Sequence, residues 1–173
     1  MNLPDPMIIR IPSNALVVLC GPAACGKSTF ARKNFERSEI VSTDRCRAMI
    51  FDDEKNQSVS GHAFELFYFI IEKRLRLARL AAADSTALAP EARKELLRLA
   101  RAYGRSAHVI AFDLAVETLL ERDRRRRRKV GEEVIRKQAE KFAQVLECLG
   151  AEGFDAVWRL DEKTAESARV ERV

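Results

Sequence analysis

The apolar residues of this chain fall into short continuous runs separated by longer stretches with helical spacing. Such runs are typical of strands that are buried on both faces of a parallel sheet. They span residues 15–20, 39–42, 80–83, 107–112 and 156–160. Over residues 64–78, 92–103 and 135–149, apolar residues instead recur three or four positions apart, which predicts amphipathic helices.

This alternation of short strands and longer helices predicts an α/β fold with a central, mainly parallel sheet of four to five strands flanked by helices. Ligands of such sheets bind at the carboxyl ends of the strands, so the residues that follow the strands are the candidates for function. Pro90 suits the first turn of a helix. Residues 161–173 fit either a last edge strand or a helix.

The length of 173 residues and the apolar content of 47% suit one hydrophobic core, so we expect residues 1–173 to form a single domain. No apolar run is long enough to span a membrane, and residues 1–6 are polar and broken by proline, unlike a signal peptide. These features predict a soluble, cytoplasmic protein with no membrane partner. The four cysteines have no C-x-x-C spacing, which argues against a zinc site.

A phosphate-binding loop follows the first predicted strand. Residues 21–29 read Gly-Pro-Ala-Ala-Cys-Gly-Lys-Ser-Thr, the pattern G-x-x-x-x-G-K-S, and they lead into a helix-compatible segment. In this setting the backbone N–H groups of the loop and the N-terminus of the helix surround phosphates. Lys27 is expected to reach the β- and γ-phosphates, and Ser28 to hold Mg²⁺. The residues expected to bind ATP or another NTP are Gly21, Ala23, Ala24, Cys25, Gly26, Lys27, Ser28 and Thr29.

Two further candidates follow the second strand. Asp44 is placed to accept a proton from an acceptor hydroxyl, as a carboxylate does in P-loop kinases. Arg47, one helical turn later, is placed to hold a phosphate of the acceptor. Two simpler interpretations stay open at this stage, in which Asp44 is a helix N-cap and Arg47 a surface arginine.

Asp84 ends the third predicted strand. A carboxylate there can orient water bound to Mg²⁺, although the sequence Asp-Ser-Thr also fits a simple turn.

A basic run, Arg-Asp-Arg-Arg-Arg-Arg-Arg-Lys, occupies residues 122–129 and contributes to the net charge of +5. Kinases of this class place here a lid that closes over the triphosphate, and arginines in it stabilise the transferred phosphoryl group. Arg122, Arg126 and Arg128 are the candidates. The alternatives are a solvated helix face and a nucleic-acid-binding patch.

Together these segments resemble the kinase domain of bacterial polynucleotide kinase-phosphatases, P-loop phosphotransferases that repair RNA ends. The likeness runs from Leu16 to about Arg172, and its motifs are residues 21–30, Ser42-Thr43-Asp44-Arg45-Cys46-Arg47, residues 52–60 and residues 132–137. The resemblance implies a P-loop kinase fold with a basic lid, and a 5′-hydroxyl polynucleotide kinase that transfers the γ-phosphate of an NTP to the 5′-OH of RNA or DNA.

The resemblance also implies roles for matching positions of this chain. Lys27 and Ser28 would bind the NTP and Mg²⁺, and Asp44 would be the general base. Arg47 would bind the 3′-phosphate of the acceptor, and Arg122 and Arg126 would belong to the lid. The family has asparagine where this chain has Ala87. Family members continue into phosphatase and ligase domains, so we expect either a free-standing kinase or a domain excised from such a protein, with a homodimer left open. A small-molecule P-loop kinase for a sugar, nucleoside or antibiotic, and a non-catalytic nucleotide-binding regulator, are the alternatives.

Overall fold

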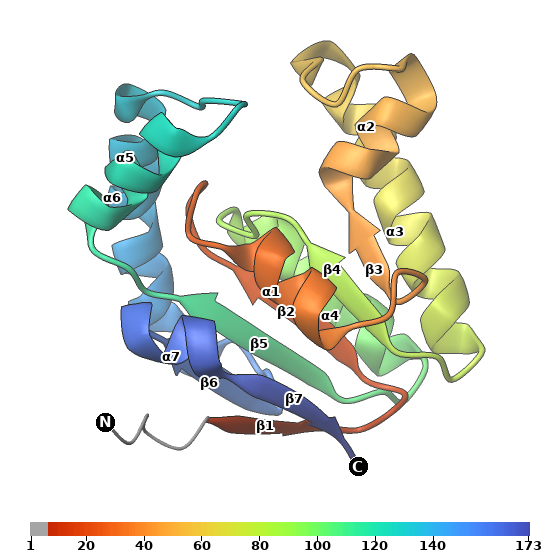
Figure 1. Ribbon diagram of the computed structural model, residues 1–173. Helices are drawn as coiled ribbons and strands as arrows, with labels where there is room; N and C mark the ends of the chain where they lie inside the picture. Colours follow the sequence, from red (N-terminus) through yellow and green to blue (C-terminus); the bar gives the residue numbers. More distant parts are fainter. Residues whose placement is uncertain (1–6) are drawn as a thin grey trace.

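A five-stranded parallel sheet forms the centre of the protein, whose residues 7–173 are described by a computed structural model (Figure 1). The strand order is β3-β4-β2-β5-β6. The strands are β2 (Leu16–Cys20), β3 (Ile40–Ser42), β4 (Ala81–Asp84), β5 (Ala107–Phe112) and β6 (Ala156–Leu160). Each predicted strand is found to within one residue, and the predicted α/β fold is confirmed. The prediction that residues 1–6 are not a signal peptide concerns positions outside the described range.

Helices cover both faces of the sheet (Figure 1). They are α1 (Lys27–Asn34), α2 (Thr43–Phe51), α3 (Ser60–Arg76), α4 (Pro90–Ala102), α5 (Val116–Arg125), α6 (Glu132–Cys148) and α7 (Glu162–Ser167), with 3₁₀ turns at Gln57–Val59 and Leu149–Ala151. Strand β2 sends Leu16 and Val18 into a core with α3 and α4, and Val17 and Leu19 into a core with α1 and α5. Because both faces are covered, the strand reads as a continuous apolar run. None of the helices within residues 7–173 is long and apolar enough to cross a membrane.

A second, two-stranded sheet joins the two ends of the described chain. Strand β1 (Ile8–Ile11) pairs in parallel with β7 (Arg169–Arg172). Residues 161–173, where both a strand and a helix fit the sequence, form α7 followed by β7. Strand β1 was not predicted, because a four-residue segment gives little periodicity and its partner lies at the far end of the chain.

The strand register brings three segments to one edge of the main sheet. Asp84, the last residue of β4, is in register with Leu19 of β2 and with Ser42 of β3. The loop after β2, the start of α2 after β3 and the end of β4 therefore meet at this edge.

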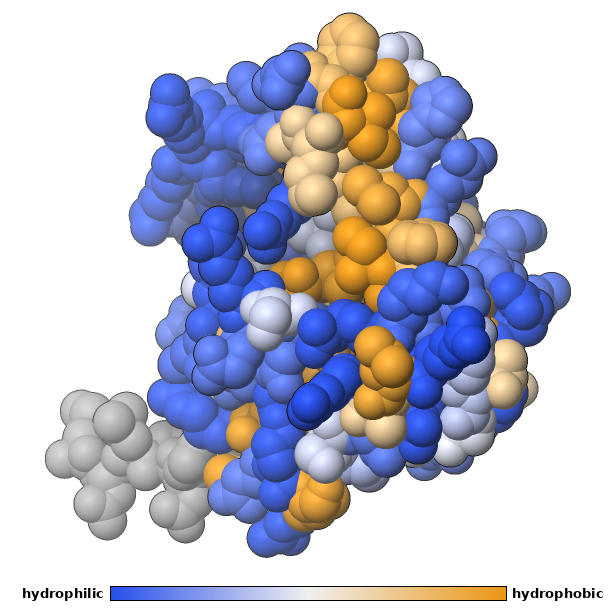
Figure 2. Space-filling model, turned by 90° about the vertical axis from the view of Figure 1, so that its right-hand side faces the viewer, coloured by the Kyte–Doolittle hydropathy of each residue, from blue (hydrophilic) through white to orange (hydrophobic). Residues whose placement is uncertain are grey.

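One face of the protein is rich in exposed apolar side chains. Figure 2 shows them gathered in a strip on the side where α2, α3 and β3 lie. The exposed large apolar residues of these helices include Met49, Ile50 and Phe51 of α2 and Phe69 of α3.

Candidate active site

Two glycines give the loop between β2 and α1 its tight shape. Gly21 has φ +154°, and a Cβ there would lie 2.9 Å from Cys25 Sγ and 3.2 Å from the carbonyl oxygen of Phe112. Gly26, with φ +102°, occupies the left-handed region directly before α1. Both positions favour glycine, the first for lack of space and the second for its backbone conformation.

The backbone N–H groups of this loop are available to a ligand. Within residues 7–173, no acceptor is found for the N–H groups of residues 24–29. They form the end of the loop and the first turn of α1, where N–H groups and the helix dipole favour anions. This row of N–H groups fits the phosphates of a nucleotide.

Lys27 lies against the same loop. The residue is 8% exposed, and Nζ donates hydrogen bonds to the carbonyl oxygens of Gly21 (2.8 Å) and Pro22 (2.7 Å). Since these partners are neutral, the positive charge of the ammonium group stays available to a phosphate held by the loop.

Ser28 and Asp84 provide oxygens beside the loop. Asp84 is buried, and the Ser28 hydroxyl lies near its carboxylate. Burial raises the pKa of Asp84, while the nearby Ser28 hydroxyl and the charge of Lys27 oppose that rise. An exposed hydroxyl backed by a buried carboxylate fits Mg²⁺, which takes few protein ligands and keeps several waters.

Asp44 lies in the first turn of α2, and the N-cap of this helix is Ser42, whose hydroxyl accepts the Arg45 N–H at 3.4 Å. The simpler interpretation of Asp44 as the N-cap is therefore wrong. Its side chain is 45% exposed and accepts hydrogen bonds from two arginines, Arg47 and Arg128, the latter at 2.9 Å.

Arg47 is buried, with its side chain 8% exposed, so the interpretation as a surface arginine is also wrong. Its Nε donates to the carbonyl oxygen of Glu54 at 2.9 Å, and its guanidinium contacts the Asp44 carboxylate. Burial of a long cationic side chain is costly without such partners. The structure thus holds a guanidinium beside the predicted general base.

The basic run forms the end of α5 and the loop to α6, with the P-loop between this connection and α2 (Figure 1). The buried Asp123 fixes the base of the connection by accepting the N–H groups of Val130 (3.0 and 3.2 Å) and Gly131 (3.1 Å). The intervening arginines therefore project from a closed loop. The role of Asp123 was not predicted, because a single acid among arginines resembles a solvated charge pair.

The lid arginines differ in their contacts. Arg122 donates to the carbonyl oxygen of Cys25 at 3.4 Å and pairs with Glu166 at 3.3 Å, so it reaches the P-loop. Arg126 is exposed, and among residues 7–173 its side chain has no hydrogen bond or ion pair. Arg128 instead reaches across to Asp44. The structure thus joins Arg122 and Arg128 to the site, and the role of Arg126 stays a prediction.

Gln138 of α6 also contacts the loop. Its Oε1 accepts the backbone N–H of Ala23 at 2.7 Å, across 115 positions of sequence. A phosphate that used this N–H would have to displace the amide. No motif marks Gln138, which lies in an ordinary amphipathic pattern.

Comparisons with known proteins identify a family and several similar folds. A family model described as an AAA domain matches residues 16–149. The APS kinase CysC of Mycobacterium tuberculosis, solved with AMPPNP and APS, is 12% identical with a TM-score of 0.55, over 90% of this chain and 94% of that chain. A gluconokinase from Sinorhizobium meliloti 1021 is 16% identical with a TM-score of 0.55, over 90% and 88%.

A chain of a Pnkp1/Rnl/Hen1 complex is 24% identical with a TM-score of 0.55, over 65% of this chain and 39% of that chain. No curated protein matches the sequence. At these identities the structural likenesses show the fold alone, and the predicted P-loop kinase fold is confirmed.

Proposed function

Since the chain belongs to the AAA-domain family of P-loop proteins, we propose that it is a phosphotransferase, and specifically a 5′-hydroxyl polynucleotide kinase. It would transfer the γ-phosphate of ATP or another NTP to the 5′-OH end of RNA or DNA. The observation that carries the proposal is the carboxylate of Asp44 beside the buried guanidinium of Arg47, at the sheet edge that also carries the P-loop.

The donor half of the site supports phosphoryl transfer. The free N–H groups of residues 24–29 would hold the phosphates, and Lys27 would neutralise charge that develops on the γ-phosphoryl oxygens. Ser28, backed by Asp84, would hold Mg²⁺, which would supply positive charge against the phosphates. Arg122, already in contact with the loop, would add a second cation from the lid.

The acceptor half supports a hydroxyl next to a phosphate. Asp44 would accept the proton of the attacking 5′-OH. The 5′ oxygen of the acceptor would bond to the γ-phosphorus, and the bond between that phosphorus and the β-phosphate oxygen would break. Arg47 would hold the 3′-phosphate of the same nucleotide, because a guanidinium matches two phosphate oxygens. A regulator that only binds nucleotide would have no use for this pair.

The proposal can be tested by incubating the protein with [γ-³²P]ATP, Mg²⁺ and an acceptor panel. The panel contains 5′-OH and 5′-phosphate oligonucleotides of RNA and DNA, a nucleoside, gluconate and adenosine 5′-phosphosulfate. We expect label on the 5′-OH oligonucleotides alone. The Lys27→Ala variant serves as the control against a contaminating kinase and should transfer no label. Label on a small molecule but on no oligonucleotide would favour the small-molecule alternative, and no label on any acceptor would contradict the phosphotransferase.

A further inference from the structure

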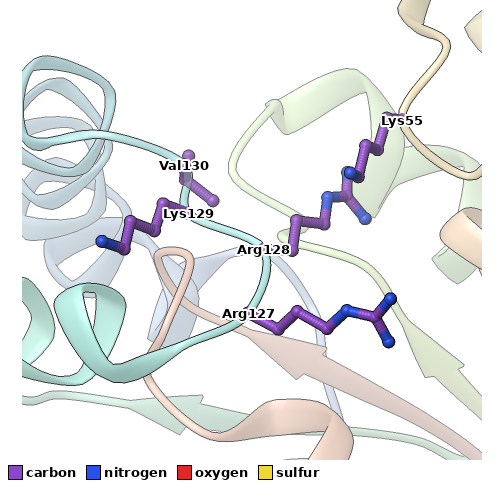
Figure 3. Close-up of a pocket in the computed structure, with 5 residues that line it drawn as sticks. All are labelled: Lys55, Arg127, Arg128, Lys129 and Val130. Carbon is purple, nitrogen blue, oxygen red and sulfur yellow. The ribbon is translucent and has the colours of Figure 1, made fainter.

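A cationic hollow adjoins the candidate acceptor site. It has a volume of about 280 Å³ and lies between the lid loop and the segment that follows α2. Its lining residues are Lys55, Arg127, Arg128, Lys129 and Val130, so four of the five carry a positive charge. Figure 3 shows Arg127 and Arg128 extending from the lid loop toward the side where Lys55 lies, whereas the ammonium group of Lys129 points the other way.

Three of these four cations have no counter-charge. Among residues 7–173, the ammonium groups of Lys55 and Lys129 and the guanidinium of Arg127 make no hydrogen bond or ion pair. Arg128 is paired, at 2.9 Å with Asp44 and at 3.3 Å with Glu54. Like charges held close together repel one another, and an anion between them removes that repulsion.

The hollow has room for a phosphate group. At about 30 Å³ for each water molecule of the liquid, 280 Å³ is the volume of about nine waters, which is enough for a hydrated phosphate. The hollow is open to solvent, so a strand that places a phosphate there can continue beyond it.

Two contacts connect the hollow to the acceptor site. Arg128 lines the hollow and also binds the Asp44 carboxylate. Glu54 binds Arg128 through its carboxylate and Arg47 through its backbone carbonyl. A phosphate in the hollow and a phosphate on Arg47 would therefore be near neighbours, as consecutive phosphates of one strand are.

We propose that this hollow binds a second phosphate of the acceptor, one nucleotide further from the 5′ end than the phosphate held by Arg47. This inference rests on the proposed function and narrows its substrate class to strands with at least two phosphodiester or phosphomonoester groups. A phosphate in the hollow also offers Arg128 a new partner, which would free Asp44 to accept a proton.

The test measures binding in the absence of ATP and Mg²⁺, so it does not depend on catalysis. Isothermal titration calorimetry compares a 5′-OH nucleoside 3′-phosphate, with one phosphate, and a 5′-OH dinucleotide 3′-phosphate, with two. The proteins are the wild type, a Lys55→Ala/Arg127→Ala variant and a control variant, Arg124→Ala/Lys141→Ala. The control removes the same charge from two exposed positions that are not among the residues lining the hollow.

We expect the wild type to bind the two-phosphate compound about tenfold or more tightly than the one-phosphate compound at about 0.1 M salt. The Lys55→Ala/Arg127→Ala variant should lose most of that difference and bind the one-phosphate compound as the wild type does. The control variant should keep the difference to within about twofold. Equal binding of the two compounds by the wild type, or equal losses in both variants, would overturn the proposal.

The second phosphate site and the kinase activity can each be wrong while the other is right, and the measurements distinguish these cases. If label transfer to 5′-OH ends occurs with the same kcat/KM for both compounds in all three proteins, the second phosphate site is wrong and the kinase stands. If no transfer occurs but the binding difference is found and is lost in the Lys55→Ala/Arg127→Ala variant, the phosphate site stands and the kinase is wrong.

Discussion

Replacement of Asp44 by asparagine removes a charge and a proton acceptor while it preserves the shape of the side chain. If Asp44 is the general base, the loss should lower the rate of phosphoryl transfer by about 10²–10⁴-fold, the usual contribution of general-base catalysis. That range corresponds to about 2.7–5.5 kcal/mol of activation free energy.

The cost to folding should be smaller. The cap of α2 is Ser42, so the variant keeps its helix N-cap. A charge in the first helical turn contributes about 0.3–1 kcal/mol, and a half-exposed ion pair such as that with Arg128 about 0–1 kcal/mol. The buried Arg47 loses its counter-charge, but it keeps its hydrogen bond to the carbonyl oxygen of Glu54, and the amide oxygen of the variant can still accept its other hydrogen bond. We therefore expect the free energy of unfolding to fall by no more than about 3 kcal/mol.

The assay is single-turnover transfer from saturating [γ-³²P]ATP to a 5′-OH oligonucleotide, together with ATP affinity and urea unfolding of the same protein. Asp52→Asn is the matched control, because Asp52 ends the same helix, is exposed, and has a left-handed φ of +58° that asparagine tolerates. A transfer rate for Asp44→Asn within fivefold of the wild type would refute the general-base role. A large loss of stability with an unchanged rate for the folded fraction would show a structural role instead.

Four further changes are predicted. Arg47→Lys keeps the charge but loses the two-point geometry, so steady-state kinetics should show an acceptor KM raised about tenfold with the ATP KM unchanged, and a raised ATP KM would contradict the assignment. Arg93→Ala should lower the free energy of unfolding in urea by about 3 kcal/mol, because Arg93 is 2% exposed and pairs with Glu152 at 2.6 Å; a change below about 1 kcal/mol would refute this. Ala78→Gly should raise the free energy of unfolding by about 1 kcal/mol, since Ala78 has φ +56° in the turn that ends α3, and a lower Tm would contradict it. Burial lowers the pKa of His108 below 6.5, so the unfolded chain binds this proton more readily than the folded chain as the pH falls. The urea concentration at the midpoint of unfolding should therefore decrease as the pH is lowered from 6.5 in the wild type, and decrease less steeply in His108→Gln.

The strands of the main sheet, and the residues that directly follow them, could be predicted from the sequence. The apolar runs located the strands to within one residue, and the motif at residues 21–29 stood in the strand and helix context that a phosphate-binding loop needs. Asp44, Arg47 and Asp84 could be singled out because parallel strands bring their carboxyl ends to one edge. Two alternatives that the sequence left open, a capping role for Asp44 and an exposed Arg47, needed the structure to be rejected.

The contacts between distant segments could not be read in this way. Three contacts join groups that no local pattern relates. Gln138 accepts the Ala23 N–H, Arg128 pairs with Asp44, and Asp123 accepts the N–H of Val130 at the base of the lid loop. In a run of arginines the residue types are identical, so the direction of each side chain depends on how the loop is closed and packed.

The sequence by itself determined the five strands of the main sheet and the position of the phosphate-binding loop, because hydrophobic periodicity and loop motifs act over a few residues. Only the tertiary structure decided which cation meets which carboxylate, and that Lys55 and Arg127 line one hollow. The physical reason is that charge interactions depend on separation in space, and the fold sets that separation for residues far apart in the chain.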